Sequence, residues 1–270
     1  MGNISSYLNP VLSLGGLGLL FGLLLGYASK KFAIEVDPKI PMVRDALPGA
    51  NCGGCGYPGC DACAKAIVEG KASPNACPVG GAEVAKKVGE ILGVSVEAGE
   101  KNVAFVKCKG TCDKSKEKFI YNGIMDCRQA TQTPGEGSKG CSYGCLGLGS
   151  CVKVCAFDAI EIEDGIAVVN EDKCTACGMC VAACPKDLID LVPASKKVRV
   201  QCNSEDKGKD VRSYCEVGCI ACNICQKTCR FGAIKVTNNI AQVDYSKCTQ
   251  CMECVNKCPT KVISGLIAKK

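Results

Sequence analysis

Three runs of cysteines with one common spacing constrain this chain more than any other feature. Each run reads C-x2-C-x2-C-x3-C, and two of the runs are followed by a proline, Pro185 or Pro259. The runs are Cys174, Cys177, Cys180 and Cys184; Cys219, Cys222, Cys225 and Cys229; and Cys248, Cys251, Cys254 and Cys258. Thiolates at this pitch are typical of sites that hold [4Fe–4S] clusters. The sequence therefore predicts a protein that carries single electrons.

Composition argues against other uses of so many cysteines. The 270 residues include 26 cysteines and no histidine. A disulfide framework does not need the same tight run three times, and a zinc site needs two C-x2-C pairs without the further cysteines found here. The absence of histidine excludes a Rieske centre and an imidazole base. No G-x-G-x-x-G follows a strand pattern, so a flavin or nicotinamide fold is not expected.

The N-terminal segment has the length and composition of a membrane anchor. Residues Leu8–Ala28 are almost wholly apolar, and a helix of this length rises roughly 31 Å, which matches a bilayer core. A cleaved signal peptide would carry basic residues before the apolar run, whereas Lys30 and Lys31 follow it. We therefore expect an uncleaved single-pass anchor with the rest of the chain in the cytoplasm. A glycine face that favours a membrane partner is formed by Gly18, Gly22 and Gly26.

A separate cluster domain is expected after the anchor. Four cysteines are spaced C-x2-C-x4-C-x16-C, with glycines that allow tight turns between the first two. They are Cys52, Cys55, Cys60 and Cys77. Short helices are expected at Asp61–Glu69 and Ala82–Leu92. Cys63 would share a helix face with Cys60, and we interpret it as a small buried hydrophobe and not as a ligand.

The C-terminal half contains an internal duplication. Cysteines and their neighbours recur 74 residues later, as Cys145 does at Cys219 and Cys141 at Cys215. Each copy includes a β-hairpin pattern, Ile160–Val169 or Ile234–Val243, with Asp164-Gly165 or Asn238-Asn239 at the turn. Repetition of this kind indicates two tandem two-cluster ferredoxin-like modules.

Ligand sets follow from the two-cluster pattern, in which the fourth cysteine of a run binds the other cluster. Three complete sets are predicted. They are Cys219, Cys222, Cys225 and Cys258; Cys248, Cys251, Cys254 and Cys229; and Cys174, Cys177, Cys180 and Cys155. With the N-terminal domain, these sets account for four clusters.

One further set lacks a cysteine, because Leu148 stands where the second module has Cys222. Three thiolates remain there, those of Cys145, Cys151 and Cys184. We predict that Cys141, the nearest cysteine, supplies the fourth. A three-iron cluster or a labile fourth position is the alternative.

These five clusters leave several cysteines without an assigned role. Besides Cys63, the remaining ones are Cys108, Cys112, Cys127, Cys202 and Cys215. They could supply the ligands of a sixth cluster or be isolated buried thiols. Iron quantitation distinguishes about twenty from about twenty-four irons per chain, at four per cluster.

A lysine-rich stretch is a candidate docking surface for an acidic partner. The net charge of +6 is dispersed, but basic residues outnumber acidic ones between positions 101 and 139. Complementary charge speeds the encounter of partners. The docking candidates are Lys114, Lys116 and Lys118, although a solvated surface would have the same composition. Nucleic-acid binding is not expected, because no tryptophan is present and aromatic residues are not interleaved with the basic ones.

The order of these parts resembles that of the B subunits of Rnf complexes. The segments that carry the resemblance are Gly26–Phe32, Cys52–Cys60, Cys108–Cys112 and Cys141–Cys145, the last two being typical of the longer form in anaerobic bacteria. The family implies an electron-transfer subunit of a membrane-bound ferredoxin:NAD+ oxidoreductase that exports Na+ or H+. It further implies soluble ferredoxin as electron donor, and membrane and flavin- or NAD-binding subunits as partners in the bacterial inner membrane. Ala156 and Arg230 depart from the ferredoxin proline.

The predicted fold class is α+β. We expect a transmembrane anchor (1–31), a small helical [4Fe–4S] domain (32–98), a cysteine-containing connecting segment (99–140) and two ferredoxin-like modules (141–192 and 193–270). An alternative function is a membrane-tethered polyferredoxin that supplies another oxidoreductase without ion coupling. Co-purification separates the two functions: several membrane subunits with a flavoprotein for the first, a different enzyme for the second.

Overall fold

The computed structural model describes residues 4–32, 37–96 and 99–265, with side chains from residue 11 onward. The chain forms two units, Met1–Ile40 and Pro41–Lys270. The predicted domain limits at residues 1, 98 and 270 lie outside the described residues. The predicted α+β class with one N-terminal apolar helix is confirmed.

The first unit is dominated by one long helix, α1 (Ile4–Lys31), which ends with Lys30 and Lys31. Its segment Val11–Lys31 has a mean hydropathy of 2.0, so its length and composition suit a membrane span. The glycine face is open: a Cβ atom added at Gly18, Gly22 or Gly26 would meet no atom within 4 Å.

Three helices build the N-terminal part of the second unit. They are α2 (Lys39–Ala46), α3 (Cys60–Val68) and α4 (Gly81–Leu92). The last two are the predicted helices, each begun one residue earlier, whereas α2 was not expected from its short polar sequence. Val43 of α2, Ile67 of α3 and Val88 of α4 are almost fully buried, so α2 forms because its apolar side completes this small core.

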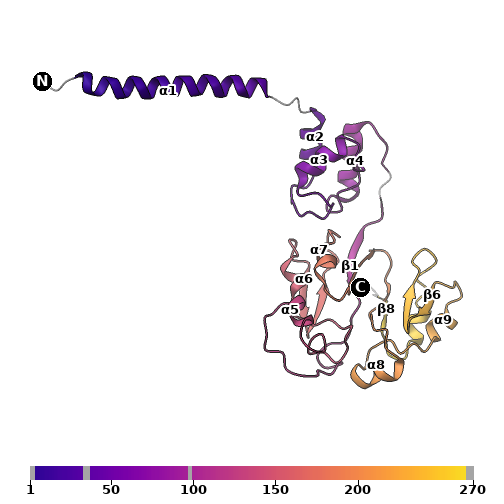
Figure 1. Cartoon of the computed structure of the whole chain (residues 1–270). Coiled ribbons are helices and arrows are strands. Elements are labelled where there is room, and N and C mark those ends of the chain that lie inside the picture. Colours follow the sequence, from indigo (N-terminus) through magenta and orange to yellow (C-terminus); the bar gives the residue numbers. More distant parts are fainter. Residues whose placement is uncertain (1–3, 33–36, 97–98, 266–270) are drawn as a thin grey trace. The chain divides into compact units, whose positions relative to one another are not determined.

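Two modules of similar build follow, drawn in magenta to orange and in orange to yellow in Figure 1. Each contains a hairpin and a second antiparallel pair of strands. The hairpins are β2 (Ile160–Glu163) with β3 (Ile166–Val169) and β6 (Ile234–Thr237) with β7 (Ile240–Val243), as predicted. The second pairs are β1 (Asn102–Val106) with β4 (Ile189–Pro193) and β5 (Val198–Val200) with β8 (Ile263–Gly265).

Strand β1 lies in the predicted connecting segment but belongs to the sheet of the first module. Val103 pairs with Val192 of β4, and both are buried. In the second module, Val200 of β5 pairs with Ile263 of β8 in the same way. The repeated unit therefore begins with β1 and β5, and Cys108 and Cys202 each stand two residues beyond the end of the equivalent strand.

Short helices form much of the rest of the two modules. They are α5 (Cys127–Thr131), α6 (Ser150–Lys153), α7 (Met179–Ala183), α8 (Gly208–Tyr214), α9 (Ile224–Thr228) and α10 (Glu253–Lys257), and all but α8 carry a cysteine. The residue before α6, α7, α9 and α10 has a positive φ, and at two of these positions it is not glycine: Asn223 (58°) and Met252 (62°). These left-handed residues turn each chain segment so that its cysteines face inward.

Candidate iron–sulfur centres

The N-terminal domain gathers its four predicted ligands around one small cavity. Cys52, Cys55, Cys60 and Cys77 line it together with Cys63. The Asn51 side-chain oxygen accepts the N–H of Cys60 at 2.8 Å and so fixes the start of α3. Burial and a hydrogen bond with Cys55 raise the pKa of Cys63 to about 12. Cys63 is 1% exposed, as expected of a packing residue.

The second module gathers both of its predicted sets. Cys219, Cys222, Cys225 and Cys258 line one cavity. Burial and the neighbouring Cys248, Cys251 and Cys229 raise the pKa of Cys254 to about 11, so these four sulfurs are close to one another. The corresponding set of the first module is also gathered. Burial and the neighbouring Cys177, Cys174 and Cys155 raise the pKa of Cys180 to about 11.

Backbone N–H groups point at several of these sulfurs. Ala159 donates to Cys155 at 3.4 Å, and its counterpart in the repeat, Ala233, donates to Cys229 at 3.3 Å. The side-chain amide of Gln250 also donates to the sulfur of Cys248, at 3.1 Å. Hydrogen bonds of this kind stabilise negative charge on cluster sulfur and raise reduction potentials.

Beside Cys145, Cys151 and Cys184 the structure places a cysteine other than the predicted Cys141. The cysteine that lines a cavity with these three is Cys127, and Cys141 lies in a different set. Helix α5 explains this placement. Ser150 at the start of α6 accepts the N–H of Cys127 at 2.7 Å and donates to Asp126, the N-cap of α5, at 3.0 Å.

Four cysteines from both modules surround a further cavity. We call them the junction set: Cys108, Cys141, Cys202 and Cys215. Cys108 and Cys202 occupy equivalent places after β1 and β5, and Cys141 and Cys215 are equivalent in the duplication. Each module therefore contributes the same pair. Of the five cysteines considered for a sixth cluster, three lie here, and Cys127 and Cys112 do not.

Hydrogen bonds connect the junction set to a ligand set on either side. The N–H of Cys145 donates to the sulfur of Cys108 at 3.4 Å. The N–H of Cys219 donates to the sulfur of Cys202 at 3.3 Å. Because Cys219 is the counterpart of Cys145, the two contacts repeat the same geometry in the two modules. The three neighbouring sets are thus in direct contact.

Burial disfavours the thiolate form of two cysteines in these sets. It raises the pKa of Cys202 and of Cys151 to about 12, the latter with a contribution from Cys145. Iron binding must displace those protons, because the thiolate is the ligand. Within the described residues, no three acidic, cysteine or histidine side chains converge as tightly as one metal ion requires. The sets surround cavities instead, which suits the wider iron–sulfide core.

Cys112 lies outside all of these sets. It is exposed, and its N–H donates to the carbonyl of Asp164 in the turn between β2 and β3 at 2.9 Å. Its role in the structure is therefore that of a contact with the hairpin.

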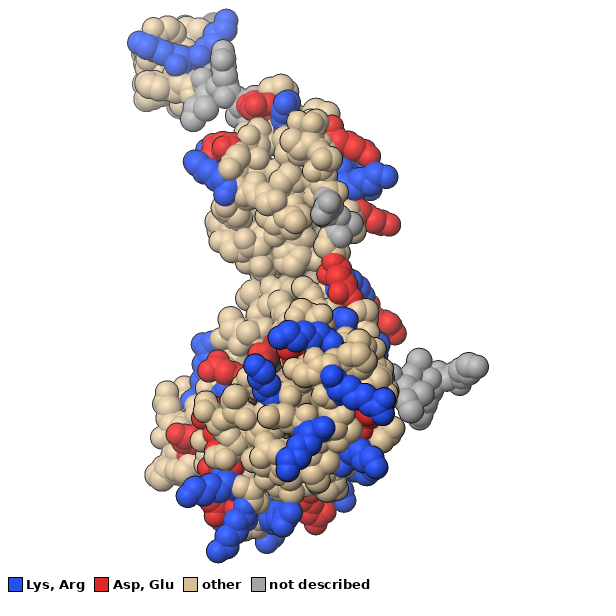
Figure 2. All heavy atoms as spheres, turned by 90° about the vertical axis from the view of Figure 1, so that its right-hand side faces the viewer, with Lys and Arg blue, Asp and Glu red and all other residues tan. Residues whose placement is uncertain are grey.

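The predicted lysine-rich docking surface is only partly free. Lys114 forms ion pairs with Asp113 at 3.1 Å and with Glu216 at 3.8 Å. Lys116 and Lys118 are exposed, and Lys118 donates to the carbonyl of Gly135. On the face shown in Figure 2, basic side chains are spread over the ferredoxin-like region with acidic ones among them.

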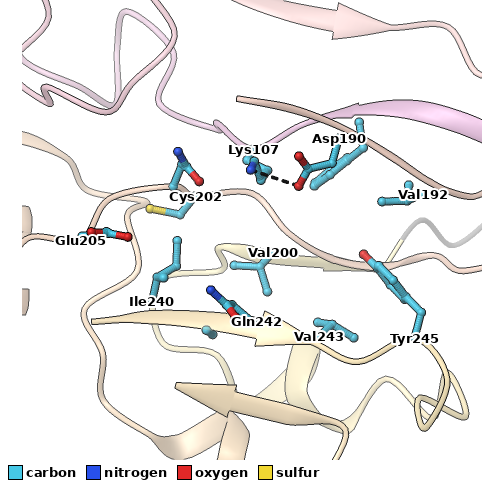
Figure 3. Close-up of a pocket in the computed structure, with 13 residues that line it drawn as sticks. Lys107, Asp190, Val192, Val200, Cys202, Glu205, Ile240, Gln242, Val243 and Tyr245 are labelled. Atoms are coloured by element: carbon cyan, nitrogen blue, oxygen red, sulfur yellow. Dashed lines mark ion pairs between the residues drawn. The ribbon is translucent and has the colours of Figure 1, made fainter. Parts of the chain in front are cut away.

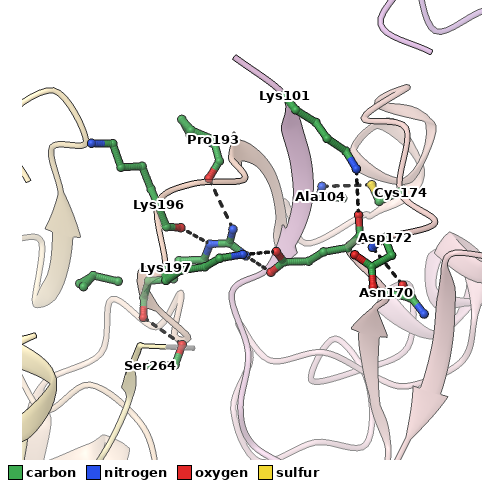
Figure 4. Close-up of polar contacts among 12 residues, drawn as sticks. Lys101, Ala104, Asn170, Asp172, Cys174, Pro193, Lys196, Lys197 and Ser264 are labelled. Carbon is green, nitrogen blue, oxygen red and sulfur yellow. Dashed lines mark hydrogen bonds and ion pairs between the residues drawn. The ribbon is translucent and has the colours of Figure 1, made fainter. Parts of the chain in front are cut away.

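A buried ion pair connects the two modules (Figure 4). Arg199 of β5 is 2% exposed, and its guanidinium lies 2.6 Å from Glu171 of the first module. It also donates to the carbonyl of Lys196 and lies over the ring of Phe105 in β1, 5.4 Å from the centroid. Burial raises the pKa of Glu171, but Lys197 and Arg199 outweigh it and hold that pKa below its usual value of 4.5.

A cavity of about 280 Å³ lies beside this ion pair, between the two modules (Figure 3). Val192, Val200 and Val243 form part of its wall, and the ion pair of Lys107 with Asp190 closes one side at 3.0 Å. Cys202 lines both this cavity and the one within the junction set.

Comparison with known proteins agrees with this arrangement. A family model for an Fe-S cluster matches residues 47–79, and a model for a 4Fe-4S binding domain matches residues 167–190 and 241–264. The chain is 54% identical, over 97% of its length and 79% of the relative, to the B subunit of the Na(+)-translocating ferredoxin:NAD(+) oxidoreductase complex of Acetobacterium woodii.

Two further relatives cover nearly the whole chain. The B subunit of the ion-translocating oxidoreductase complex of Methanosarcina acetivorans is 50% identical over 96% of this chain and 98% of the relative. The B subunit of the proton-translocating ferredoxin:NAD(+) oxidoreductase complex of Clostridium ljungdahlii is 46% identical over 93% and 90%, respectively.

Two ferredoxin-like modules joined to a small cysteine-rich domain define an iron–sulfur electron-transfer protein with multiple [4Fe–4S] clusters. Within that class, the chain belongs to the B subunits of Rnf-type ion-translocating oxidoreductase complexes. The resemblance noted from the sequence is confirmed.

Proposed function

We propose that the chain relays single electrons from reduced ferredoxin to a partner subunit of an ion-translocating ferredoxin:NAD+ oxidoreductase. The relatives in A. woodii and C. ljungdahlii are named as subunits of such complexes. The observation that carries the proposal is the junction set, in which two cysteines from each module surround one cavity. It offers a site for a cluster at the place where the two modules meet.

The proposed ligands form six sets of four and leave Cys63 and Cys112 over. The sets are Cys52, Cys55, Cys60 and Cys77; Cys155, Cys174, Cys177 and Cys180; Cys127, Cys145, Cys151 and Cys184; Cys108, Cys141, Cys202 and Cys215; Cys219, Cys222, Cys225 and Cys258; and Cys229, Cys248, Cys251 and Cys254.

The surroundings of the junction set fit a cluster. All four donors are cysteines, the donor type that [4Fe–4S] clusters use. Ser115 lines the same cavity, and its buried hydroxyl has no hydrogen-bond partner among the described residues. A sulfide of a bound cluster would accept a hydrogen bond from that hydroxyl, and so satisfy an otherwise costly buried group.

Contacts between the sets support one linear order. The backbone of Gly54 in the N-terminal set approaches Cys177 so closely that an added Cβ would lie 2.5 Å from the Cys177 carbonyl oxygen. The set of Cys177 shares a module with that of Cys145, which contacts the junction set through Cys108. Cys202 of the junction set accepts the N–H of Cys219 and so connects the junction set to the second module. These contacts support a series that runs from the N-terminal set through the junction set to the second module.

The bound clusters would supply reversible one-electron transfer at potentials set by their surroundings. The residues of the chain fix the spacing of the sites, exclude water from the buried thiolates and direct N–H groups at sulfur. Proton transfer is not required of any side chain.

Iron content tests the relay as proposed. We expect about twenty-four irons per full-length chain, at four per cluster, and fewer by about four in Cys215→Ser if the junction site is lost. A purified chain with about twenty irons that is unaffected by Cys215→Ser would contradict the sixth site.

The anchor and its sidedness also belong to the proposal. Lys30 and Lys31 at the end of α1 favour a single-pass orientation with the modules in the cytoplasm. The open glycine face of α1 would pack against a membrane subunit of the complex.

Docking of ferredoxin is proposed at Lys116 and Lys118, because Lys114 is already neutralised by its acidic neighbours. We expect Lys116→Glu with Lys118→Glu to slow reduction by ferredoxin about tenfold at low salt and to flatten its salt dependence. Reversal of the exposed Lys86 and Lys87 on α4 is the matched control. An unchanged salt dependence would place the dock elsewhere.

A further inference from the structure

Lys139 is a buried cation between two proposed cluster sites. Its residue is 8% exposed, and its ammonium donates to the carbonyl of Cys145 at 2.8 Å and to the carbonyl of Gly110. Cys145 belongs to one set, and Lys139 itself lines the cavity of the junction set. One side chain therefore lines one site and contacts the backbone of a ligand residue of the other.

The charge of Lys139 has no carboxylate partner. None of the ion pairs among residues 11–32, 37–96 and 99–265 includes it, and both of its acceptors are neutral carbonyls. An isolated buried ammonium is costly, and buried charges in proteins are normally compensated. The groups on either side that can carry negative charge are the cysteine sulfurs of the two sets.

We propose that Lys139 stabilises the reduced state of both adjoining sites and so sets the potential on the first module's side of the junction. This inference rests on the proposed relay, since it needs clusters at the two sites. The positive charge of Lys139 would offset the negative charge that one electron adds at either site. No proton or other reactant is consumed.

The contact is specific to the first module. The position 74 residues after Lys139 is Ser213, which is exposed and donates to the carbonyl of Asp210. The two modules therefore differ in charge on this side, where Lys186 also lines the cavity of the Cys145 set and Thr260 takes its place in the second module. The electron would meet a more favourable potential on the side of Cys145 than on the side of Cys219.

Redox titration of the purified full-length chain, followed by EPR with dithionite as reductant, tests the inference. Signals are assigned with Cys127→Ser and Cys215→Ser. Lys139→Gln should lower the equilibrium constant for reduction of these two sites threefold to tenfold. A tenfold change corresponds to about 59 mV for one electron. Lys139→Arg should restore most of it, and the other sites should not change.

Lys101→Gln is the matched control, because Lys101 also donates to a carbonyl, that of Glu171, but is exposed. Its potentials should equal those of the parent chain. Lys139→Gln that keeps about twenty-four irons but leaves all potentials unchanged would overturn this inference alone. Loss of iron from Lys139→Gln would also overturn the inference, because Lys139 would then be needed to hold the structure of the site and not to set its potential. A parent chain with about twenty irons would instead overturn the proposed relay.

Discussion

At the scale of single residues, Cys127 illustrates how a ligand can come from outside a run. Its N–H donates to Ser150, which in turn donates to the cap residue Asp126, and these two bonds hold it beside Cys151. The backbone N–H groups of Arg128 and Gln129 also donate to Asp126 and so fix the start of α5. The sulfur is thereby brought into a site whose other ligands are far along the chain.

Substitution of single cysteines tests this assignment. We expect Cys127→Ser to change the EPR signal of one [4Fe–4S] cluster or convert it to a three-iron signal, because an oxygen ligand binds iron less well there. Cys112→Ser is the control, since Cys112 is exposed and lies outside every set. If the Cys127 variant has the spectrum of the parent chain, the fourth ligand is another group.

What could be predicted from the sequence is also clearest at this scale. Fixed spacing was enough to group the cysteines of complete runs, because neighbouring positions on one loop must wrap one site. Spacing says nothing about Cys127, and proximity along the chain pointed to Cys141 instead. The equivalence of Cys108 with Cys202 could be seen only once β1 was known to match β5, since the first module carries an insertion between Cys108 and Cys141 that hides the repeat.

At the scale of elements, the contact between the short helices α5 and α6 holds Cys127 in its place. Helices of this length are not stable alone, so their position depends on side-chain contacts. Ser150 is 7% exposed and satisfies both the N–H of Cys127 and the carboxylate of Asp126. The hairpins, by contrast, were predictable because their turn residues accept a positive φ: Asp164 (46°), Gly165 (77°), Asn238 (50°) and Asn239 (62°).

Loss of the Ser150 hydroxyl should weaken the contact between α5 and α6. Ser150→Ala leaves the Cys127 N–H without its acceptor, and we expect a destabilisation of about 1–3 kcal/mol. The denaturant midpoint for loss of visible cluster absorbance measures it under anaerobic conditions. Ser213→Ala, at an exposed serine of α8 that also donates to a carbonyl, should leave the midpoint unchanged. Equal midpoints for both variants would show that α5 is held by other contacts.

At the scale of the whole molecule, the stability of the second unit depends on how its two modules are joined. Arg199 and Glu171 form the buried part of that joint, with Phe105 beneath the guanidinium. Neither residue lies in a cysteine run, so no sequence pattern singles them out. Their partnership depends on tertiary packing that brings β5 beside the loop after β3.

Removal of one partner should weaken the joint. We expect Arg199→Met to cost about 1–3 kcal/mol, because it removes the buried partner of Glu171 and leaves that carboxylate with the ion pair to Lys197 alone. Arg199→Met combined with Glu171→Gln should cost less than Arg199→Met alone. Chemical unfolding of the full chain measures both, with the exposed Arg212→Met as control. A double variant less stable than Arg199→Met would argue against an electrostatic joint.

The same pair should respond to acid in a defined direction. The pKa of Glu171 is held below 4.5 in the folded chain, so its contribution is present at neutral pH and is lost as the pH falls through that lowered pKa. Between pH 7 and 5 the joint should therefore keep its strength. The difference in unfolding midpoint between the parent chain and Glu171→Gln should shrink only in stronger acid.

The junction set has a mechanical consequence as well. Its cysteines span the chain from Cys108 to Cys215, so a bound cluster would be an inorganic cross-link that closes a loop of more than a hundred residues. Closing a loop of that size restricts the unfolded chain strongly, and the cost of doing so without a cross-link grows with loop length. Oxidative loss of this one cofactor would then interrupt the electron path and also remove a cross-link between the two modules. Damage and unfolding would therefore begin at the same point.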